Sequence, residues 1–533
     1  MTPPPDTYQD IYEFLGEASI MKYDHIIVGG GTAGCIVATR LSEDPARSVL
    51  LLEAGPEYPD FEQLPDSLKY GWGMLNLEAR KSGGPFNWSF TGTATPHQPE
   101  LMPVPRGKAM GGTSAINGQT FIRGAPEDFD TWASWGNYEW SYVHCLPYFR
   151  KLERDEDYSG DFHGTEGPVP VRRHHRGTWP PAQEAFYQAC IAAGYPDNPD
   201  VHEPDSTGVS LRAENNIDGI RMSMALAYLD PSRHRINLAV KAGVQALKVI
   251  FSGNRATGLE VESGGERFIV EGDEIILCAG AIGSPQILML SGVGPADHLA
   301  EIGIPVVANR PGVGQNMRDH PNVTVKFTVR EGLYDDPNGM RALRLRFSAT
   351  GSKTPNDMIL SPASMNTVIK EGDNPSHTIN CGLYLAIGKG ELRLTSADPR
   401  RQPRMDYHYL EDPWDRERLR EAVRKCVDLL KDPAYFGIIE ERTAPLDSDL
   451  VSDQSLDDWL LRNVSSSFHI SGTCKMGPDT DGGAVVDQHL NVRGVEGLRV
   501  VDASVMPDVV RANTNVTTMM IAERAADFIR EGR

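Results

Sequence analysis

Residues 23–53 constrain the fold of this 533-residue chain more strongly than any other segment. The apolar run from Tyr23 to Val28 is typical of a buried strand, and it leads directly into Gly-Gly-Gly-Thr-Ala-Gly, which fits the pattern G-x-G-x-x-G. A second apolar run ends at Glu53, about 20 residues after these glycines. A bare glycine pattern also occurs in ordinary turns. Strand, glycine turn, helix and spaced acid together predict a dinucleotide-binding unit.

Each glycine of this pattern has a mechanical role. Gly29 permits the tight turn, Gly31 lets backbone N–H groups approach a pyrophosphate, and Gly34 lets the helix pack against the strand. The helix N-terminus then faces the phosphates, and the Glu53 carboxylate can accept hydrogen bonds from a ribose. The predicted contacts in this unit are Gly29, Gly31, Thr32, Ala33, Gly34, Glu53 and Ala54.

Composition narrows the classes of partner. Lys and Arg total 52 against 73 Asp and Glu, a formal charge of −21, so we expect neither nucleic acid nor an anionic membrane as a partner, and an anionic substrate is disfavoured. The seven cysteines are scattered and none forms a C-x-x-C pair, so we predict no disulfide framework, no zinc or other metal, and a reducing, cytoplasmic location.

The termini and apolar runs give no sign of membrane insertion or export. The sequence contains no run of about 18 uncharged apolar residues. Its first twenty residues lack both the basic and the apolar region of a signal peptide. Met21 directly precedes the first strand, so we interpret residues 1–20 as an N-terminal extension or as the product of an upstream translation start.

Two further glycine-rich blocks decide which dinucleotide is bound. The first reads GKAMGGTSAINGQTFIRG from Gly107, and its small residues let a backbone lie against a flat ligand while Ser114 and Asn117 offer hydrogen bonds. The second reads GAIGSPQILMLSGVG from Gly280 and predicts a strand end that opens a helix ending at Gly292. By itself, the first block could also be a glycine-rich loop with structural turns.

With both blocks present, the chain resembles the glucose-methanol-choline (GMC) family of FAD oxidoreductases from about Tyr23 to the C-terminus. Met110 stands where the family more often has Leu, Ile or Val, a swap that conserves volume. Some members tether FAD through a histidine at the position of Ile116, so the resemblance implies noncovalent FAD here. It adds the following to the predicted cofactor contacts: Gly111, Gly112, Ser114, Asn117, Gly118, Val244, Ala279, Asp502, Ala503 and Thr514.

The resemblance also implies a reaction centre. His469, in the run SFHISGTCKMG, aligns with the family's catalytic base, and Asn513 aligns with its usual histidine or asparagine partner. The chemistry agrees, since alcohol oxidation needs a base of near-neutral pKa for the hydroxyl proton while hydride leaves the carbon for flavin N5. Asn513 can donate to the developing alkoxide, and a helix starting near Asn515 would place its positive end by the reduced flavin.

Other histidines are interpreted as structural. His320 follows the family-like stretch Gly314–Asn316 and is predicted to make a structural contact. The two histidines at 174 and 175 lie beside three arginines and predict a solvated basic face rather than a metal site.

The predicted fold class is α/β: a discontinuous, Rossmann-like FAD-binding domain with a largely parallel sheet, and a second α+β substrate-binding domain built on an antiparallel sheet. Up to about Val323 the sequence alternates between strand-like and helix-like segments, and from there it consists of short segments with alternating apolar and polar residues. A strand-like apolar segment like those of the first part returns at Leu498. The predicted boundaries are an N-terminal extension at 1–20, FAD-binding segments at 21–150, 206–320 and 460–533, substrate segments at 151–205 and 321–459, and a lid or cofactor-covering loop at 57–105.

The sequence therefore predicts an FAD-dependent oxidase or dehydrogenase that converts a neutral aryl, furanic, aliphatic or sugar alcohol to an aldehyde or ketone. The electron acceptor, oxygen or a quinone or other carrier, is left open, as is the oligomeric state. Three alternatives on the same scaffold remain at this point: a non-redox hydroxynitrile lyase, a light-driven fatty-acid decarboxylase, and a flavin-binding protein without catalysis. The pair of His469 and Asn513 argues against the decarboxylase.

Overall fold

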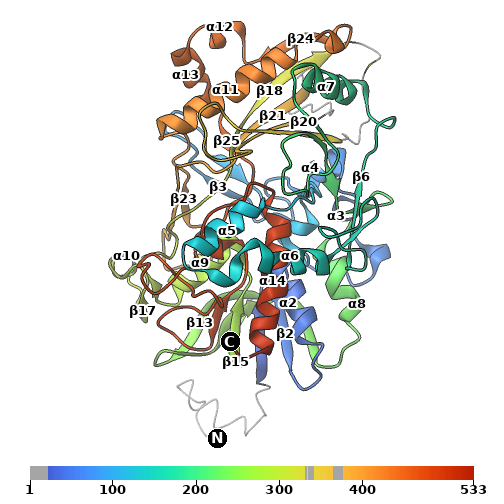
Figure 1. Cartoon of the computed structure of the whole chain (residues 1–533). Helices are drawn as coiled ribbons and strands as arrows, with labels where there is room; N and C mark the ends of the chain where they lie inside the picture. Colours follow the sequence, from blue (N-terminus) through green and yellow to red (C-terminus); the bar gives the residue numbers. More distant parts are fainter. Residues whose placement is uncertain (1–21, 331–332, 334–340, 364–375) are drawn as a thin grey trace, which may run out of the picture.

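The computed structural model describes residues 22–330, 333, 341–363 and 376–533; the predicted extension at 1–20 lies outside this part of the chain. Two large sheets organise the described residues, one of seven strands and one of eight. Figure 1 shows the first sheet in the lower half of the molecule, around β2, β13 and β15, and the second in the upper half, around β18, β20 and β21. The predicted α/β class is confirmed.

The first sheet has a parallel part of five strands. Its order is β12 (Leu238–Ala242), β2 (Val49–Glu53), β1 (Tyr23–Val28), β15 (Glu266–Leu277) and β26 (Leu498–Val500). The central strands β1 and β2 and the end of β15 are rich in Ile, Leu and Val because both of their faces are covered. In the register of this sheet, Ile27 lies opposite Leu51 on one side and Ile276 on the other. The carboxyl ends of β1 and β2 therefore meet at one edge, where the glycine turn follows Val28.

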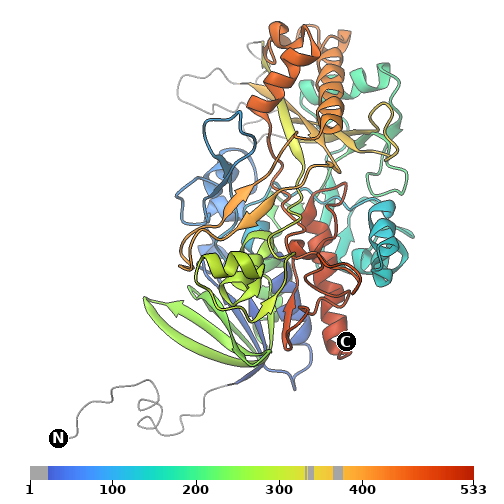
Figure 2. The same ribbon diagram turned by 90° about the vertical axis from the view of Figure 1, so that its left-hand side faces the viewer.

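One strand of this sheet joins two short apolar segments of the sequence. The segments at 268–270 and 274–277 both belong to β15, whose first half pairs with β14 (Arg255–Ser263) and whose second half pairs with β1. The antiparallel strands β13 (Gln245–Ser252), β14 and the first half of β15 project from the parallel part as a separate layer, which Figure 2 shows at the lower left. The sheet is therefore mixed, and its parallel character is limited to five strands.

The C-terminal helix packs against the first helix of the chain. Helix α14 (Thr514–Arg530) lies beside α2 (Thr32–Leu41), as Figure 1 shows in red and blue. The Thr32 hydroxyl donates to Asn515 Oδ1 over 2.7 Å, and the Arg40 guanidinium pairs with the fully buried Glu523 carboxylate at 2.8 Å. With β26 in the first sheet, the last segment of the chain thus completes the unit that the first segment begins. The domain boundaries given above remain predictions.

The second sheet is mainly antiparallel. Its order is β24 (Ile439–Ala444), β18 (Pro321–Val329), β21 (His377–Leu383), β20 (Met358–Ala363), β19 (Leu343–Phe347), β8 (Gly208–Leu211) and β7 (Asp197–Asn198), with β25 (Ser465–Ser466) also paired to β18. Helix α11 (Pro413–Leu429) packs against it through an apolar stripe in which Leu419, Val423 and Cys426 are fully buried. This sheet matters for function because β18, β19 and β25 end beside the residues described below.

The remaining elements are short and connect or cover the two sheets. The predicted lid at 57–105 contains α3 (Asp66–Lys69), α4 (Gly73–Ala79), β3 (Phe90–Gly92) and β4 (Met102–Val104). The other elements are α5 (Pro126–Ser134), α6 (Tyr142–Leu152), β5 (Glu153–Asp155), β6 (Val169–Arg173), α7 (Pro181–Ala192), β9 (Ala213–Glu214), β10 (Asn216–Ile217), β11 (Ile220–Arg221), α8 (Asp230–Ser232), α9 (Gly280–Leu290), β16 (Val293–Gly294), α10 (Ala296–Glu301), β17 (Ala308–Asn309), β22 (Glu391–Arg393), β23 (Arg404–Asp406), α12 (Asp447–Leu450) and α13 (Asp453–Asn463). No helix among the described residues is long and apolar enough to span a membrane.

Candidate active site

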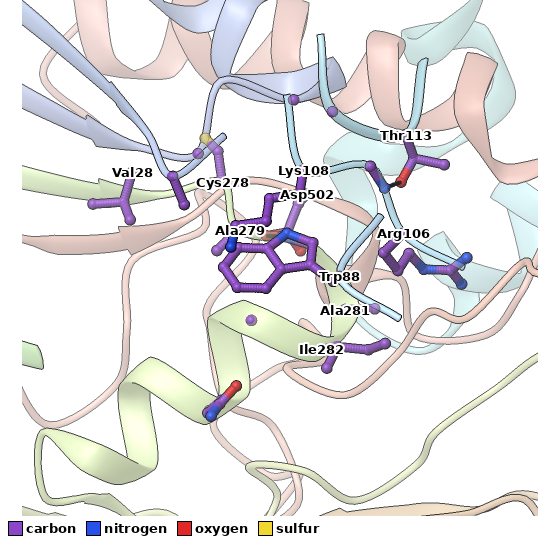
Figure 3. Close-up of a pocket in the computed structure, with 18 of the residues that line it drawn as sticks. Val28, Trp88, Arg106, Lys108, Thr113, Cys278, Ala279, Ala281, Ile282 and Asp502 are labelled. Atoms are coloured by element: carbon purple, nitrogen blue, oxygen red, sulfur yellow. Dashed lines mark hydrogen bonds between the residues drawn. The ribbon is translucent and has the colours of Figure 1, made fainter. Parts of the chain in front are cut away.

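A cavity of about 540 Å³ opens at the carboxyl edge of the parallel strands. Its wall combines the ends of β1 and β2, the first turn of α9, the loop after β4 and the start of α14. Figure 3 shows Val28, Cys278 and Ala279 at the strand ends, with Trp88 and Lys108 lying across the cavity from α9. The Lys108 ammonium lies 4.6 Å from the centre of the Trp88 ring. An elongated space at this edge of an α/β sheet is where a dinucleotide binds.

The glycine turn has the shape that the sequence predicts. Gly29 has a φ of +102°, a conformation that L side chains rarely adopt. A Cβ on Gly34 would overlap the Gly29 carbonyl oxygen, whereas a Cβ on Gly31 would have Gly112 Cα, at 3.8 Å, as its nearest protein atom. Gly34 is therefore required for packing of the helix, whereas the space beside Gly31 is not filled by protein atoms and is open to the cavity.

Glu53 organises the turn through both of its carboxylate oxygens. Oε2 accepts the N–H of Gly30 and Oε1 accepts the N–H of Gly55, each over 2.8 Å. Burial raises the pKa of Glu53 to about 7, an effect that these backbone hydrogen bonds partly offset. Ribose hydroxyl groups that donate to this carboxylate would favour its charged form, so the site fits the ligand group that the spacing of Glu53 predicts.

Asp502 fixes the start of α9 against the end of β26. Its Oδ2 accepts hydrogen bonds from the Gly280 N–H at 2.9 Å and the Ser284 hydroxyl at 2.6 Å, and its Oδ1 accepts the Ser504 N–H at 2.8 Å. Burial raises the pKa of Asp502. The side chain lies in the cavity wall, so it both shapes the site and faces it.

Most of the predicted cofactor contacts lie in the cavity wall. Those that do are Gly29, Gly31, Thr32, Ala33, Glu53, Ala54, Gly112, Val244, Ala279, Asp502, Ala503 and Thr514. Those outside the wall are Gly34, Gly111, Ser114, Asn117 and Gly118. Ser114 is fully buried, donates to the Gly111 carbonyl at 2.5 Å and accepts the Met224 N–H at 3.0 Å, so it holds the first glycine block in shape.

His469 and Asn513, 44 positions apart in the chain, form a hydrogen-bonded pair. Their nitrogens His469 Nε2 and Asn513 Nδ2 are 2.9 Å apart. Because an amide nitrogen can only donate, Nε2 of the imidazole is the acceptor and carries a lone pair. Neither residue lies in the cavity wall itself, but their chain neighbours Phe468, Ile470 and Thr514 do. The pair therefore borders the cavity.

His320 fixes the tautomer of His469, a role that the sequence does not reveal. Its Nδ1 lies 2.8 Å from His469 Nδ1, and since Nε2 of His469 is the acceptor, Nδ1 of His469 carries the proton and donates to His320. The His320 ring is fully buried and stacks on Tyr384 with ring centres 3.9 Å apart. The sequence predicts only a structural contact for His320, and in the structure its partner is the predicted base.

Asp319 clamps the two loops that carry these histidines. Its Oδ1 accepts the backbone N–H of His320 at 2.7 Å and that of His469 at 2.8 Å. Its Oδ2 accepts the Tyr409 hydroxyl at 2.9 Å and the Ser466 hydroxyl. Burial lowers the pKa of His469 to about 3, and the nearby Arg344 and Arg106 add to this shift. The imidazole is thus neutral near pH 7 and keeps a free lone pair, but its pKa lies well below the near-neutral value expected of the base from the sequence, because the ring is buried beside two arginines.

Comparisons with known proteins identify the family of the chain. The family models described as GMC oxidoreductase match residues 23–322 and 387–522, which together are more than half of the chain. The chain belongs to the GMC oxidoreductase family. It is 36% identical to an uncharacterized GMC-type oxidoreductase of Rhodococcus erythropolis, over 95% of this chain and 98% of that protein. It is 37% identical to the mitochondrial choline dehydrogenase of Mus musculus, over 96% of this chain and 89% of that protein.

Solved structures of the GMC family share the whole fold. Pyridoxine 4-oxidase from Mesorbium loti matches with a TM-score of 0.88 and 28% identity, covering 96% of this chain and 99% of that one. Formate oxidase matches with a TM-score of 0.87 and 25% identity, covering 96% and 98%. The cofactor of this GMC oxidoreductase is accordingly FAD, and the chain is an oxidoreductase. Ile116 is buried and offers no atom for covalent attachment, which fits the predicted noncovalent binding.

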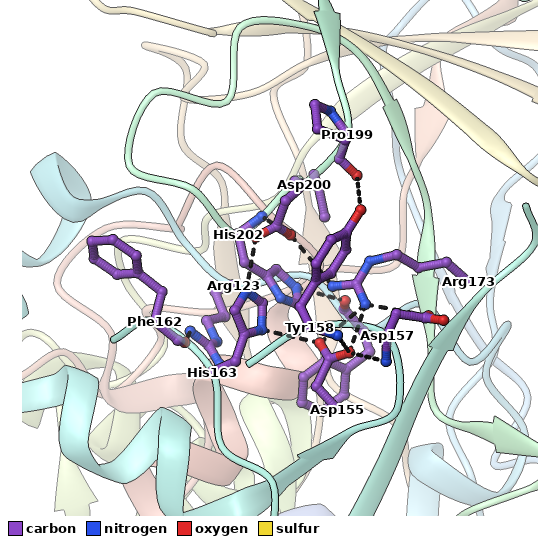
Figure 4. Close-up of polar contacts among 12 residues, drawn as sticks. Arg123, Asp155, Asp157, Tyr158, Phe162, His163, Arg173, Pro199, Asp200 and His202 are labelled. Atoms are coloured by element: carbon purple, nitrogen blue, oxygen red, sulfur yellow. Dashed lines mark hydrogen bonds and ion pairs between the residues drawn. The ribbon is translucent and has the colours of Figure 1, made fainter. Parts of the chain in front are cut away.

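A separate buried cluster brings together side chains that could bind a metal ion, but these side chains already form ion pairs with one another and with neighbouring arginines. Glu153, Asp155, His163 and His202 place possible ligand atoms within 4.8 Å of one another. Figure 4 shows that Arg123, Arg173 and Asp200 complete the group. Arg123 pairs with Glu153, and Arg173 pairs with Asp155 at 2.8 Å. Arg173 is therefore buried, contrary to the solvated basic face predicted at this run, whereas His175 is exposed and bonds Asp157 at 2.8 Å.

His163 is the third cation of this cluster. Its Nε2 hydrogen-bonds Asp200 Oδ2 over 2.8 Å, and its Nδ1 lies 3.0 Å from Asp155 Oδ2 in an ion pair. Carboxylates thus face both ring nitrogens, which favours the imidazolium form. Hydrogen bonds to Asp155, Asp200 and Glu153 outweigh the opposing effect of burial and raise the pKa of His163 to about 10. Three carboxylates thus face three cations, and a metal ion would have to displace a proton and compete with two guanidinium groups.

We expect the His163→Gln substitution to lower the free energy of unfolding by about 3–5 kcal/mol, because it removes one of the three cations that face three buried carboxylates. Since the His163 pKa is raised, its contribution in the wild type is complete below about pH 6.5 and is lost as the pH rises through about 10. Denaturant melts at pH 6, 8 and 10 measure both effects. His175→Gln, which removes an exposed histidine with a similar carboxylate partner, should change stability by less than ~1 kcal/mol. Equal effects of the two substitutions would contradict the assignment.

Proposed function

We propose that this GMC oxidoreductase oxidises the CH–OH group of a small-molecule alcohol to a carbonyl, with His469 as base and Asn513 as the group that positions the substrate oxygen. The observation that carries the proposal is the 2.9 Å contact between His469 Nε2 and Asn513 Nδ2 at the border of the cavity. This places a lone pair and an amide N–H donor side by side, the two groups that an alcohol hydroxyl needs when it loses its proton.

In this mechanism the hydroxyl group inserts at the pair. His469 Nε2 accepts the hydroxyl proton and Asn513 Nδ2 donates to the oxygen as negative charge develops on it. His320, which accepts from His469 Nδ1, keeps the lone pair on Nε2. FAD, when bound, supplies the acceptor for the hydride that leaves the carbinol carbon. The two electrons thus leave with the hydride, the proton stays on His469, and the C–O bond becomes a carbonyl.

The residues proposed to hold FAD follow from the cavity wall. Backbone N–H groups of the turn at Gly29–Ala33 and the N-terminus of α2 would bind the pyrophosphate, and Glu53 would bind the ribose. Thr514 and Asn515 bring the N-terminus of α14 into the wall near the reaction centre, where its positive end favours negative charge. Trp88, Lys108 and Gln286 are further wall residues that the sequence did not predict.

An anaerobic panel of aryl, furanic, aliphatic and sugar alcohols tests the proposal, with flavin absorbance as the readout. Loss of the oxidised flavin spectrum with at least one alcohol is the expected result. Admission of oxygen and then of a quinone identifies the electron acceptor. A lyase would cleave hydroxynitriles without a net change in the flavin, a decarboxylase would release CO₂ from fatty acids only in blue light, and a non-catalytic protein would leave every alcohol unchanged. Any of these three outcomes without flavin reduction would refute the proposal.

A further inference from the structure

A buried arginine without an anionic partner lies beside the proposed reaction centre. Arg344, on β19, is 4% exposed, and its Nη2 donates to Asn513 Oδ1 over 3.2 Å. Its Nε and Nη1 are buried and have no hydrogen-bond partner among the described residues. No ion pair of Arg344 with a carboxylate occurs in that part of the chain either. Burying an unpaired guanidinium is costly, and proteins normally pair such a charge or use it to bind an anion.

The surroundings of Arg344 increase this positive charge. Arg346, two residues further along the same strand, is 2% exposed and donates only to uncharged oxygens, among them the Ser206 hydroxyl at 2.6 Å. Arg212 is buried nearby, and its partner Glu214, at 2.7 Å, neutralises only that one arginine. Burial lowers the pKa of Arg344, and the charge of Arg212 adds to the shift. The charge excess at this end of β19 is therefore cationic, although the whole chain carries −21.

We infer that the substrate of this enzyme carries a carboxylate close to its carbinol carbon and that Arg344 binds it. The inference rests on the proposed function and names the substrate class for the same site. Arg344, Asn513 and His469 are consecutive links of one hydrogen-bond chain. A hydroxyl held by Asn513 and His469 thus lies only a few bond lengths from the unpaired nitrogens of Arg344. In a short hydroxy acid, the hydroxyl and the carboxylate are separated by about this distance.

The local charge distinguishes this substrate class from the alternatives. A quaternary ammonium alcohol such as choline, the substrate named for several relatives, would meet Arg344 as a like charge and be repelled. A neutral alcohol would leave the guanidinium buried and unpaired. A carboxylate would neutralise it through charge-assisted hydrogen bonds. The reaction is otherwise unchanged: the carbinol becomes a carbonyl, its hydride passes to FAD, its proton passes to His469, and the carboxylate stays intact, so the product is an oxo acid.

The test compares hydroxy acids with their primary amides as reductants of the holoenzyme flavin without oxygen. The pairs are glycolate and glycolamide, 3-hydroxypropionate and its amide, mandelate and mandelamide, and 4-(hydroxymethyl)benzoate and its amide. For at least one pair, the acid should exceed the amide in kcat/KM by at least ~30-fold, since loss of one partner of a buried charge pair commonly costs this much or more. Arg344→Met should reduce this ratio to about 1, and Arg344→Lys should retain part of it.

Arg346→Met is the matched control, because it removes a buried guanidinium from the same strand without a contact to Asn513 or His469. It should change the acid-to-amide ratio by less than ~3-fold. FAD content and thermal melting of each variant show whether it folds. Binding gives a readout that does not depend on turnover: acetate, propionate and benzoate should perturb the oxidised flavin spectrum of the wild type at concentrations that leave Arg344→Met unchanged.

The outcomes separate this inference from the proposed function. If neutral alcohols or amides reduce the flavin as well as the acids do, the inference is wrong and the proposed function stands. If Arg344→Met slows acid and amide equally and carboxylates bind it as they bind the wild type, Arg344 only orients Asn513 and the inference is again wrong. If no compound reduces the flavin, the proposed function fails. The binding of acetate, propionate and benzoate then still decides whether Arg344 holds an anion.

Discussion

Replacing His469 with alanine is expected to slow anaerobic reduction of the flavin by at least ~100-fold, because general bases commonly contribute ~10² to 10⁴ to the rate. The reason is structural as well as chemical. Nε2 of His469 is the lone-pair acceptor in a hydrogen-bond chain that runs from Arg344 through Asn513 and His469 to His320, so the substitution removes the atom proposed to take the hydroxyl proton. Stopped-flow absorbance with the best alcohol of the panel measures the rate directly.

FAD content should stay at the wild-type level in this variant, since His469 lies outside the cavity wall. His175→Ala removes an exposed histidine elsewhere and should leave the rate unchanged. A reduction rate for His469→Ala within a few-fold of the wild type would refute its role as base.

The second large effect is expected at the glycine turn, where two substitutions should fail for different reasons. In Gly34→Ala the new Cβ overlaps the Gly29 carbonyl oxygen, so the turn cannot form as it stands and both stability and FAD content should fall. In Gly31→Ala the nearest protein atom, Gly112 Cα, is 3.8 Å away, so the apoprotein should melt as the wild type does. Its methyl group occupies the cavity wall where the pyrophosphate is proposed to lie, and the affinity for FAD should fall by at least ~10-fold.

Apoprotein melting curves and FAD titration distinguish the two effects. Wild-type affinity in Gly31→Ala would show that the pyrophosphate does not approach Gly31. A stable, fully loaded Gly34→Ala protein would show that the turn shifts at little cost, and the steric argument for this position would then be wrong.

The cofactor-binding unit could be predicted from the sequence because each of its parts leaves a local signal. The strand, the glycine turn and Glu53 are neighbours in the chain, and Gly29, Glu53 and Asp502 line the cavity. The mixed character of the first sheet could not be predicted in the same way. Gly272 lies opposite Tyr23 on β1, but nothing local says that β15 continues past it into the antiparallel layer.

The polar network around His469 could be predicted even less well from the sequence, because its members come together only in the folded chain. His320 lies 149 positions from His469 in the chain and contacts it through a single hydrogen bond. On β19 the sequence Leu-Arg-Leu-Arg-Phe alternates like a strand with one solvated face, yet all five residues are buried. An alternating pattern predicts that the two faces of a strand differ in polarity. It does not predict whether the polar face lies in solvent or beside a buried site. Arg344 was missed for this reason.

The packing of α14 against α2 has a consequence for the order in which the holoenzyme can be made. The glycine turn is synthesised early, but the cavity wall also needs Thr514 and Asn515, and the hydrogen bond from Thr32 to Asn515 joins positions near opposite ends of the described chain. A nascent chain that has completed only its first segment therefore lacks this part of the cavity wall. If the cavity holds FAD as proposed, we expect tight flavin binding only after α14 has been synthesised and has packed against α2.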